Sequence, residues 1–102
     1  MKNFKELKVW QKGFQISVLS FKLIESFPKE EKYGLSIQIT KAAVSIPSNI
    51  SEGSSRTSEK DYNRFLEIDL GSSFELETQI LISEALNFSK KEIRDNILLL
   101  LQ

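Results

Sequence analysis

Residues 35–53 read LSIQITKAAVSIPSNISEG, and this stretch decides the fold. Its apolar residues recur at spacings of three and four, which is the period of one face of an α-helix. They are Leu35, Ile39, Ala42, Ala43, Ile46 and Ile50. Pro47 lies inside this pattern, where it removes a hydrogen bond and predicts a kink or break near Val44. Gly53 suits a C-terminal cap. The stretch therefore predicts a second helix that begins near Pro28 and buries one face.

A first helix is predicted ahead of this stretch, over residues 7–26. Its apolar residues follow a heptad seam, which we assign to the core of a helical bundle. The seam consists of Leu7, Trp10, Phe14, Ser17, Phe21 and Ile24. The helix should end at Phe27, because a residue that precedes a proline is disfavoured in the α region.

Two further helices are predicted after the second. Ser58 is a good N-cap for a long third helix over residues 59–86. The apolar residues of that helix lie on most of its faces, which is typical of a helix buried on several sides. A turn at residues 87–88 leads to a short fourth helix, which Ser89 should cap. Because the connections are short, neighbouring helices should be antiparallel. Residues 1–102 are therefore predicted to form one all-α domain, an antiparallel four-helix bundle.

The composition excludes several kinds of chemistry. The chain is 40% hydrophobic and 27% charged, and it contains neither cysteine nor histidine. Disulfides, thiolate chemistry, the commonest general base and the commonest metal ligand are therefore absent. No stretch approaches the length of a transmembrane helix, and the N-terminus has no signal-peptide pattern. We therefore expect a cytoplasmic, non-enzymatic protein that needs no cofactor and binds no small-molecule substrate.

A second apolar series on the first helix predicts self-association. Val9, Ile16 and Leu23 are spaced seven residues apart, with Leu19 beside them. At about 100° per residue they point away from the heptad seam. Since monomers rarely expose such stripes, we expect these four residues to form a subunit interface.

Charge is distributed unevenly along a chain whose net charge is zero. Basic side chains gather at the N-terminus and around the start of the third helix, and they are the candidates for phosphate contacts. They are Lys2, Lys5, Lys8, Lys12, Arg56, Lys60 and Arg64. The alternative interpretation is that basic and acidic faces simply complement each other within a bundle.

Acidic side chains in the third helix suggest a polar contact inside the bundle. Asp69, Ser73 and Glu77 are spaced four residues apart between apolar residues. A buried carboxylate needs a cation or hydrogen-bond donors. We therefore hypothesise that Glu77 pairs with a polar group of the second helix and fixes the register of the bundle.

Several motifs resemble those of a known bacterial family. The motifs are LKVWQK at residues 7–12, FPKEEKYGL at 27–35, KAAVSIPSNISEG at 41–53, and LGSS and ELETQ at 70–73 and 75–79. In this order and at these separations they resemble the four helix bundle proteins encoded by intervening sequences in 23S ribosomal RNA genes. A related branch is the accessory variability protein of diversity-generating retroelements. The resemblance covers residues 4 to about 88.

The resemblance implies a four-helix bundle that forms a homopentameric ring. Its related branch binds a reverse transcriptase and template RNA through a basic surface. The signature residues of the family are read here as determinants of the fold. They are Pro47, Asn49, Glu52, Gly53, Gly71, Glu75 and Glu77.

Two functions follow as hypotheses. The first is a non-enzymatic, oligomeric scaffold that binds a partner protein or ribonucleoprotein. The alternative is an accessory protein that binds RNA and a reverse transcriptase. The neutral net charge favours the scaffold, because nucleic-acid-binding domains are usually basic.

Overall fold

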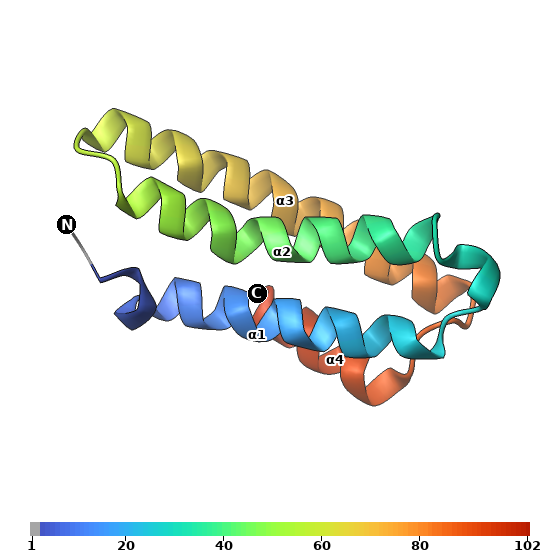
Figure 1. Cartoon of the computed structure of the whole chain (residues 1–102). Helices are drawn as coiled ribbons and strands as arrows, with labels where there is room; N and C mark the ends of the chain where they lie inside the picture. The colour runs from blue at the N-terminus through green and yellow to red at the C-terminus, as the bar shows by residue number, and fades with distance from the viewer. Residues whose placement is uncertain (1–2) are drawn as a thin grey trace.

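The computed structural model describes residues 3–102 and contains four α-helices with short connections (Figure 1). The helices are α1 (Lys8–Leu23), α2 (Leu35–Ser54), α3 (Glu59–Ala85) and α4 (Lys91–Leu100). Three single 3-10 turns accompany them: η1 (Phe4–Glu6), η2 (Ile24–Ser26) and η3 (Lys29–Glu31). Successive long helices run antiparallel, and no strand occurs among the described residues. The predicted all-α bundle is confirmed.

The face of α1 that packs into the core agrees with the predicted seam only in part, because Leu7, Trp10 and Ile24 pack against the core and the central phenylalanines do not. Ile16 and Leu23 are 3% and 0% exposed, whereas Phe14 and Phe21, which we assigned to the core, are 51% and 52% exposed. The reason is the close approach of α1 to α2. A Cβ added to Gly13 would lie 3.1 Å from Cγ2 of Ile46. The face that carries small residues beside the aliphatic ones therefore turns inward, and the bulky aromatic face turns outward.

Helix α2 continues through Pro47 without a break. Proline lacks the N–H that would donate to the carbonyl of residue 43. The hydroxyl of Ser17 in α1 lies 2.9 Å from the carbonyl oxygen of Ala43 and 3.0 Å from that of Gly13. A side chain of the neighbouring helix can thus supply the donor that Pro47 lacks. This contact fixes α1 against α2 at the proline.

The helix ends agree with the sequence in part. The Oγ of Ser58 accepts a hydrogen bond from the N–H of Asp61 at 3.1 Å, which confirms the predicted cap of α3. The second helix begins later than predicted. A 3-10 turn follows Pro28, and α2 starts at Leu35, whose N–H donates to Oε1 of Glu31 at 3.3 Å.

The predicted turn after α3 is built on Asn87, which has a φ of 60°. The N–H groups of Asn87 and Phe88 donate to the carbonyls of Glu84 and Ser83 at 3.0 and 2.9 Å. This is the Schellman arrangement that ends many helices, with asparagine in the left-handed position. Helix α4 follows with Lys90, not the predicted Ser89, at its N-cap position.

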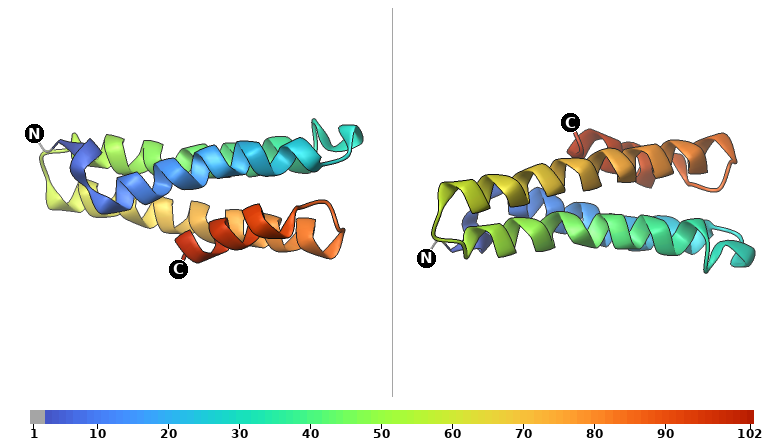
Figure 2. Two further views of the ribbon diagram at one scale, coloured as in Figure 1. Left: turned by 90° about the horizontal axis from the view of Figure 1, so that it is seen from below. Right: turned by 90° about the horizontal axis from the view of Figure 1, so that it is seen from above.

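The core is an elongated apolar cluster of Ile16, Leu23, Phe27, Ile39, Ala42, Ala43, Ile46, Ile50, Leu76, Ile80 and Ile97. Helix α1 packs mainly on α2 and α4, whereas α3 packs mainly on α2. The short α4 lies along only part of the bundle, and the chain ends midway along α1 (Figures 1 and 2). One half of the bundle therefore has four helices in cross-section and the other half has three.

Candidate interaction surfaces

The two groups of predicted phosphate contacts lie at one end of the bundle. Lys5, Lys8 and Lys12 belong to η1 and the start of α1, and Arg56, Lys60 and Arg64 flank the α2–α3 loop. Both segments lie at the same end of the molecule (Figure 1). All six side chains are exposed. Lys2 lies outside the described residues.

Acidic groups share this end with the cations. Oε1 of Glu52 lies 3.0 Å from the Arg56 guanidinium, which also sits 4.9 Å from the centre of the Phe65 ring. Glu6, Glu59 and Asp61 belong to the same segments. This end of the bundle is thus a mixed-charge surface, and the Arg56 guanidinium there is already engaged by Glu52 and Phe65.

The predicted subunit interface on α1 is wrong as a set. Ile16 and Leu23 are core residues, and Leu19 is partly buried against the core. Only Val9 is exposed, at 52%. Helix α1 carries two apolar stripes, and apolar spacing alone does not distinguish the inward stripe from the outward one.

The outward stripe of α1 consists of Phe14, Val18 and Phe21. Their spacing of four and three residues places them on one side of the helix. Phe14 and Val18 also line an open apolar groove toward α4, whose far wall includes Leu99 and Leu100. The small residues Gly13, Ser17 and Ser20 were the sequence signal that distinguishes the two stripes, because close helix contacts select such residues.

Helix α3 has more exposed large apolar residues than any other helix of residues 3–102. Its exposed large residues are Ile68, Leu70, Phe74, Leu81 and Ile82. Phe74 is 62% exposed. The sequence predicted burial on several sides for this helix, and within the chain only the face toward the core is covered.

The glycines differ in whether a neighbouring helix of the same chain lies close to them. A Cβ added to Gly53 would lie 2.8 Å from Cβ of Phe65, so Gly53 is required by the contact between α2 and α3. Gly71 lies in the middle of α3, and a Cβ there would meet nothing within 4 Å. Glycine in an exposed helix interior costs about 1 kcal/mol relative to alanine. The isolated chain offers no contact that would offset this cost at Gly71.

The remaining signature residues have varied surroundings. Asn49 is half-buried in α2, and Glu52 pairs with Arg56. Oε1 of Glu75 accepts from Nε2 of Gln79 at 3.3 Å. Glu77 is exposed, and among residues 3–102 no hydrogen bond or ion pair joins its side chain to α2. The predicted register contact of Glu77 is therefore wrong, because this side chain lies on the solvent side of α3.

The carboxylate that is partly buried is Asp69. Burial raises the pKa of Asp69 from 3.8 to about 6. Its Oδ1 is buried and has no hydrogen-bond partner. Asp69 and the half-buried Ser73 line a groove with Lys12 and Ile16 of α1 and with Leu101 near the end of the chain.

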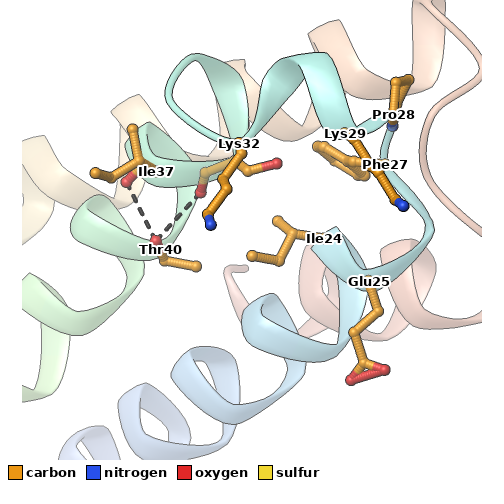
Figure 3. A pocket seen from close by; sticks show the side chains of 9 residues that line it. Ile24, Glu25, Phe27, Pro28, Lys29, Lys32, Ile37 and Thr40 are labelled. Atoms are coloured by element: carbon orange, nitrogen blue, oxygen red, sulfur yellow. Dashed lines mark hydrogen bonds between the residues drawn. The ribbon is translucent and has the colours of Figure 1, made fainter.

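A further pocket lies where α1 turns into α2 (Figure 3). Ile24 and Phe27 form its apolar part, and Lys29, Lys32 and Thr40 form its polar part. The hydroxyl of Thr40 already donates to the carbonyls of Ser36 and Ile37 at 3.2 Å. The ammonium groups of Lys29 and Lys32 point in different directions, so this pocket has no convergent set of polar groups.

The described residues contain no cluster of three acidic or other ligating side chains that could hold a metal ion. A hydrogen bond from Lys91 and the nearby Arg94 guanidinium hold the pKa of Asp95 below its usual value. Lys91 and Asp95 are exposed on α4, whereas the side chain of Arg94 is largely buried. Within residues 3–102, no helix is both long and apolar enough to cross a membrane.

Comparison with known proteins finds a similar solved structure and a matching protein family. The chain resembles a crystal structure, at 1.70 Å resolution, of a protein with unknown function from the S23 ribosomal protein family of Bacteroides thetaiotaomicron VPI-5482. The TM-score is 0.76 at 23% sequence identity, over 87% of this chain and 83% of that one. No curated protein matches the chain. The family model of the 23S rRNA-intervening sequence protein matches residues 5–102. The chain therefore belongs to the 23S rRNA-intervening sequence protein family.

Proposed function

We propose that this protein is a non-enzymatic scaffold that works as a homo-oligomer, with a homopentameric ring as the expected assembly. The observation that carries the proposal is Gly71, an exposed glycine in the middle of a 27-residue helix without a contact in its own chain. Gly13 and Gly53 each permit a close helix contact within the chain. By the same reasoning, Gly71 permits the close approach of a helix from another copy.

The apolar surface supports self-association. Leu70 and Phe74 lie on either side of Gly71 along α3, and both are exposed. On α1, the outward stripe of Phe14, Val18 and Phe21 is equally uncovered. Monomeric proteins seldom expose apolar residues in such groups.

Charge favours a contact between α1 of one copy and α3 of the next. Helix α1 carries three lysines and no acidic residue, whereas α3 carries seven acidic residues against Lys60 and Arg64. Within one chain α1 packs mainly on α2 and α4, so these opposite charges are not used against each other. A contact between unlike faces is heterologous, and heterologous contacts close into rings when the rotation permits.

Complementation between two variants tests this arrangement. Phe14→Glu should disable the α1 face and Phe74→Glu the α3 face, so each variant alone should be monomeric. A mixture retains one intact α1 face and one intact α3 face, and it should form heterodimers that grow no further. Light scattering measures the masses. If the mixture stays monomeric although both variants keep wild-type circular dichroism, the α1–α3 contact is refuted.

The alternative function is an accessory protein that binds RNA together with a reverse transcriptase. It is supported by the six exposed cations gathered at one end of the bundle. A ring would repeat this surface several times, which raises a weak affinity through multivalency. The acidic groups at the same end and the neutral chain count against it.

Salt dependence separates the two functions. A phosphate-binding protein loses affinity by orders of magnitude between about 50 and 200 mM salt. We would titrate a short structured RNA into the wild type and into Lys60→Gln/Arg64→Gln, with Lys90→Gln/Lys91→Gln at the other end as the matched control. Steep salt dependence that only the first pair abolishes would favour the RNA-binding function. Weak binding that hardly changes with salt or substitution would favour the scaffold.

A further inference from the structure

An apolar groove lies between α1 and α4 on the surface of the bundle. Its α1 wall includes Phe14, Val18 and Leu19, and its α4 wall includes Leu99 and Leu100. The groove has a volume of about 370 Å³, and none of the described residues that line it is charged. Both walls belong to helices that pack on each other, so the groove follows from the packing of α4 on α1.

The packing of α4 presents one of its leucines to solvent. Ile97 is fully buried in the core, and the guanidinium of Arg94 lies 3.6 Å from Oε2 of Glu84 in α3. These contacts fix the rotation of α4 about its axis. Leu99 lies about 200° around the helix from Ile97, and it is 66% exposed. The outer wall of the groove is therefore apolar and uncovered in the chain.

Helix α3 carries the complementary shape on the side that faces away from its own chain. Phe74 is exposed, and the exposed Leu70 and Leu81 lie four residues before it and seven after it, on the same side of the helix. The backbone at Gly71, one turn before Phe74, is open to a close approach. Helix α3 thus presents an aromatic ring flanked by leucines. Aromatic side chains that fill an apolar pocket are the usual anchors of protein interfaces.

The charges around the groove are mainly positive. Lys8 and Lys22 lie seven residues before and after Gln15, which lines the groove, so they share its side of α1 and lie beyond the two ends of the groove. Both lysines are exposed. On α4, Lys91 and Asp95 pair with each other, which leaves Glu92 as a single negative charge against the two lysines.

The charges around Phe74 are negative. Glu67 and Glu77 lie on either side of Phe74 along α3, and both are exposed. Neither carboxylate belongs to an ion pair among residues 3–102. A ring seated in the groove would bring a carboxylate toward a lysine at each end, whichever way the two helices run. This complementarity favours α3 of a second copy as the occupant of the groove.

We infer that Phe74 of one copy inserts into the groove between α1 and α4 of the next copy, so that α4 completes the acceptor site for self-association. The inference rests on the proposed homo-oligomer, and it adds the α4 wall to the contact. Each copy donates Phe74 through α3 and accepts the Phe74 of a neighbour through α1 and α4. Such a contact is heterologous.

A substitution in α4 tests the role of this helix. Leu99→Glu places a carboxylate in the groove wall and leaves the apolar stripes of α1 and α3 unchanged. The mass of the oligomer should therefore fall to that of one chain, with unchanged circular dichroism. Lys90→Glu, at an exposed position before α4 that does not line the groove, is the matched control and should keep the oligomer. An oligomer that retains its mass in Leu99→Glu would overturn the inference.

Cross-linking tests the contact itself, because the chain contains no cysteine of its own. Gln15→Cys places a thiol at the groove, and Thr78→Cys places one a single turn after Phe74. A short bismaleimide added to a co-refolded mixture of the two variants should give a covalent dimer, whereas each variant alone should give none. Val44→Cys, at an exposed position of α2, is the control for Gln15→Cys and should give no dimer with Thr78→Cys.

Light scattering of the same samples distinguishes this inference from the proposed oligomer. If the mixture is an oligomer and yields no covalent dimer, or as much with Val44→Cys as with Gln15→Cys, the groove is not the acceptor site and self-association still stands. If the wild type is a monomer, both the inference and the proposed self-association are refuted.

Discussion

Ser17 and Pro47 act as a pair across the contact between α1 and α2. The proline leaves the carbonyl of Ala43 without its helical donor, and the serine hydroxyl lies 2.9 Å from that oxygen. A proline within α2 is compatible with a continuous helix because α1 places a hydrogen-bond donor, the Ser17 hydroxyl, beside the carbonyl that lacks one.

A double-mutant cycle measures this coupling. Ser17→Ala should lower the free energy of unfolding by about 1–2 kcal/mol, because it leaves a part-buried carbonyl unpaired. In the Pro47→Ala background, the N–H of residue 47 can donate to the carbonyl of Ala43. Ser17→Ala should therefore lower the free energy of unfolding by about 1 kcal/mol less in that background. Urea denaturation of the four proteins gives the coupling energy. A coupling energy of zero would show that Ser17 does not serve as the substitute donor.

Asp69 makes stability depend on pH. Its pKa in the folded protein, about 6, lies above the ordinary 3.8. The folded state therefore binds the proton more tightly, so stability is fully present below about pH 4 and is lost as pH rises through about 6. Asp69→Asn should remove this loss and raise stability at pH 7.5 by about 1–2 kcal/mol, after allowance for solvent screening of a half-exposed group. Chemical denaturation at pH 4.5 and pH 7.5 checks this, and an unchanged pH profile in the variant would contradict it.

The helices were largely predictable, and the orientation of α1 was not. Local chemistry at Ser58 and at the turn of residues 87–88 marked the ends of α3, because capping depends on neighbouring residues alone. The face of α1 depends on how closely another helix approaches, which apolar periodicity does not encode. Phe14 and Ile16 are both apolar, and only the small residues next to Ile16 indicated which stripe lies inward.

The candidate surfaces were predictable only in part for the same reason. The cations could be named from the sequence, and the fold brings their two groups to one end of the bundle. The partial burial of Asp69 depends on the residues of other helices that line the groove beside it, and this three-dimensional relation has no local signal. The spacing of four residues predicts a buried contact at Glu77 as readily as at Asp69, because spacing alone does not reveal which carboxylate is partly buried.

The glycines of α2 and α3 should respond to alanine in opposite ways. Gly53→Ala should destabilise the fold, because the new Cβ would lie 2.8 Å from Cβ of Phe65. Gly71→Ala should stabilise the isolated chain by about 1 kcal/mol through helix propensity, and it should also weaken the oligomer. Thermal melts in the Phe74→Glu background measure the changes in stability. The concentration dependence of the mass in the wild-type background measures the weakening of the oligomer. If Gly71→Ala leaves association unchanged, Gly71 is not at a helix contact between copies.

The whole molecule is a bundle with one half open and with apolar stripes on α1 and α3 uncovered. A single chain with extents of 43 × 21 × 19 Å has little interior in which to hide these stripes. Contacts between the α1 stripe of one copy and the α3 stripe of the next would cover both stripes, as the proposed self-association requires.

If copies of this chain cover each other's exposed apolar faces, the protein is an oligomer in solution, and light scattering measures its mass. Five chains of 11.7 kDa each give 5 × 11.7 kDa, about 58 kDa, as the mass that a homopentamer predicts. Phe74→Glu should reduce this to the mass of one chain, whereas Val44→Lys should leave it unchanged. A wild-type mass of 11.7 kDa across the accessible concentration range would show that the chain is a monomer and would refute the proposed self-association.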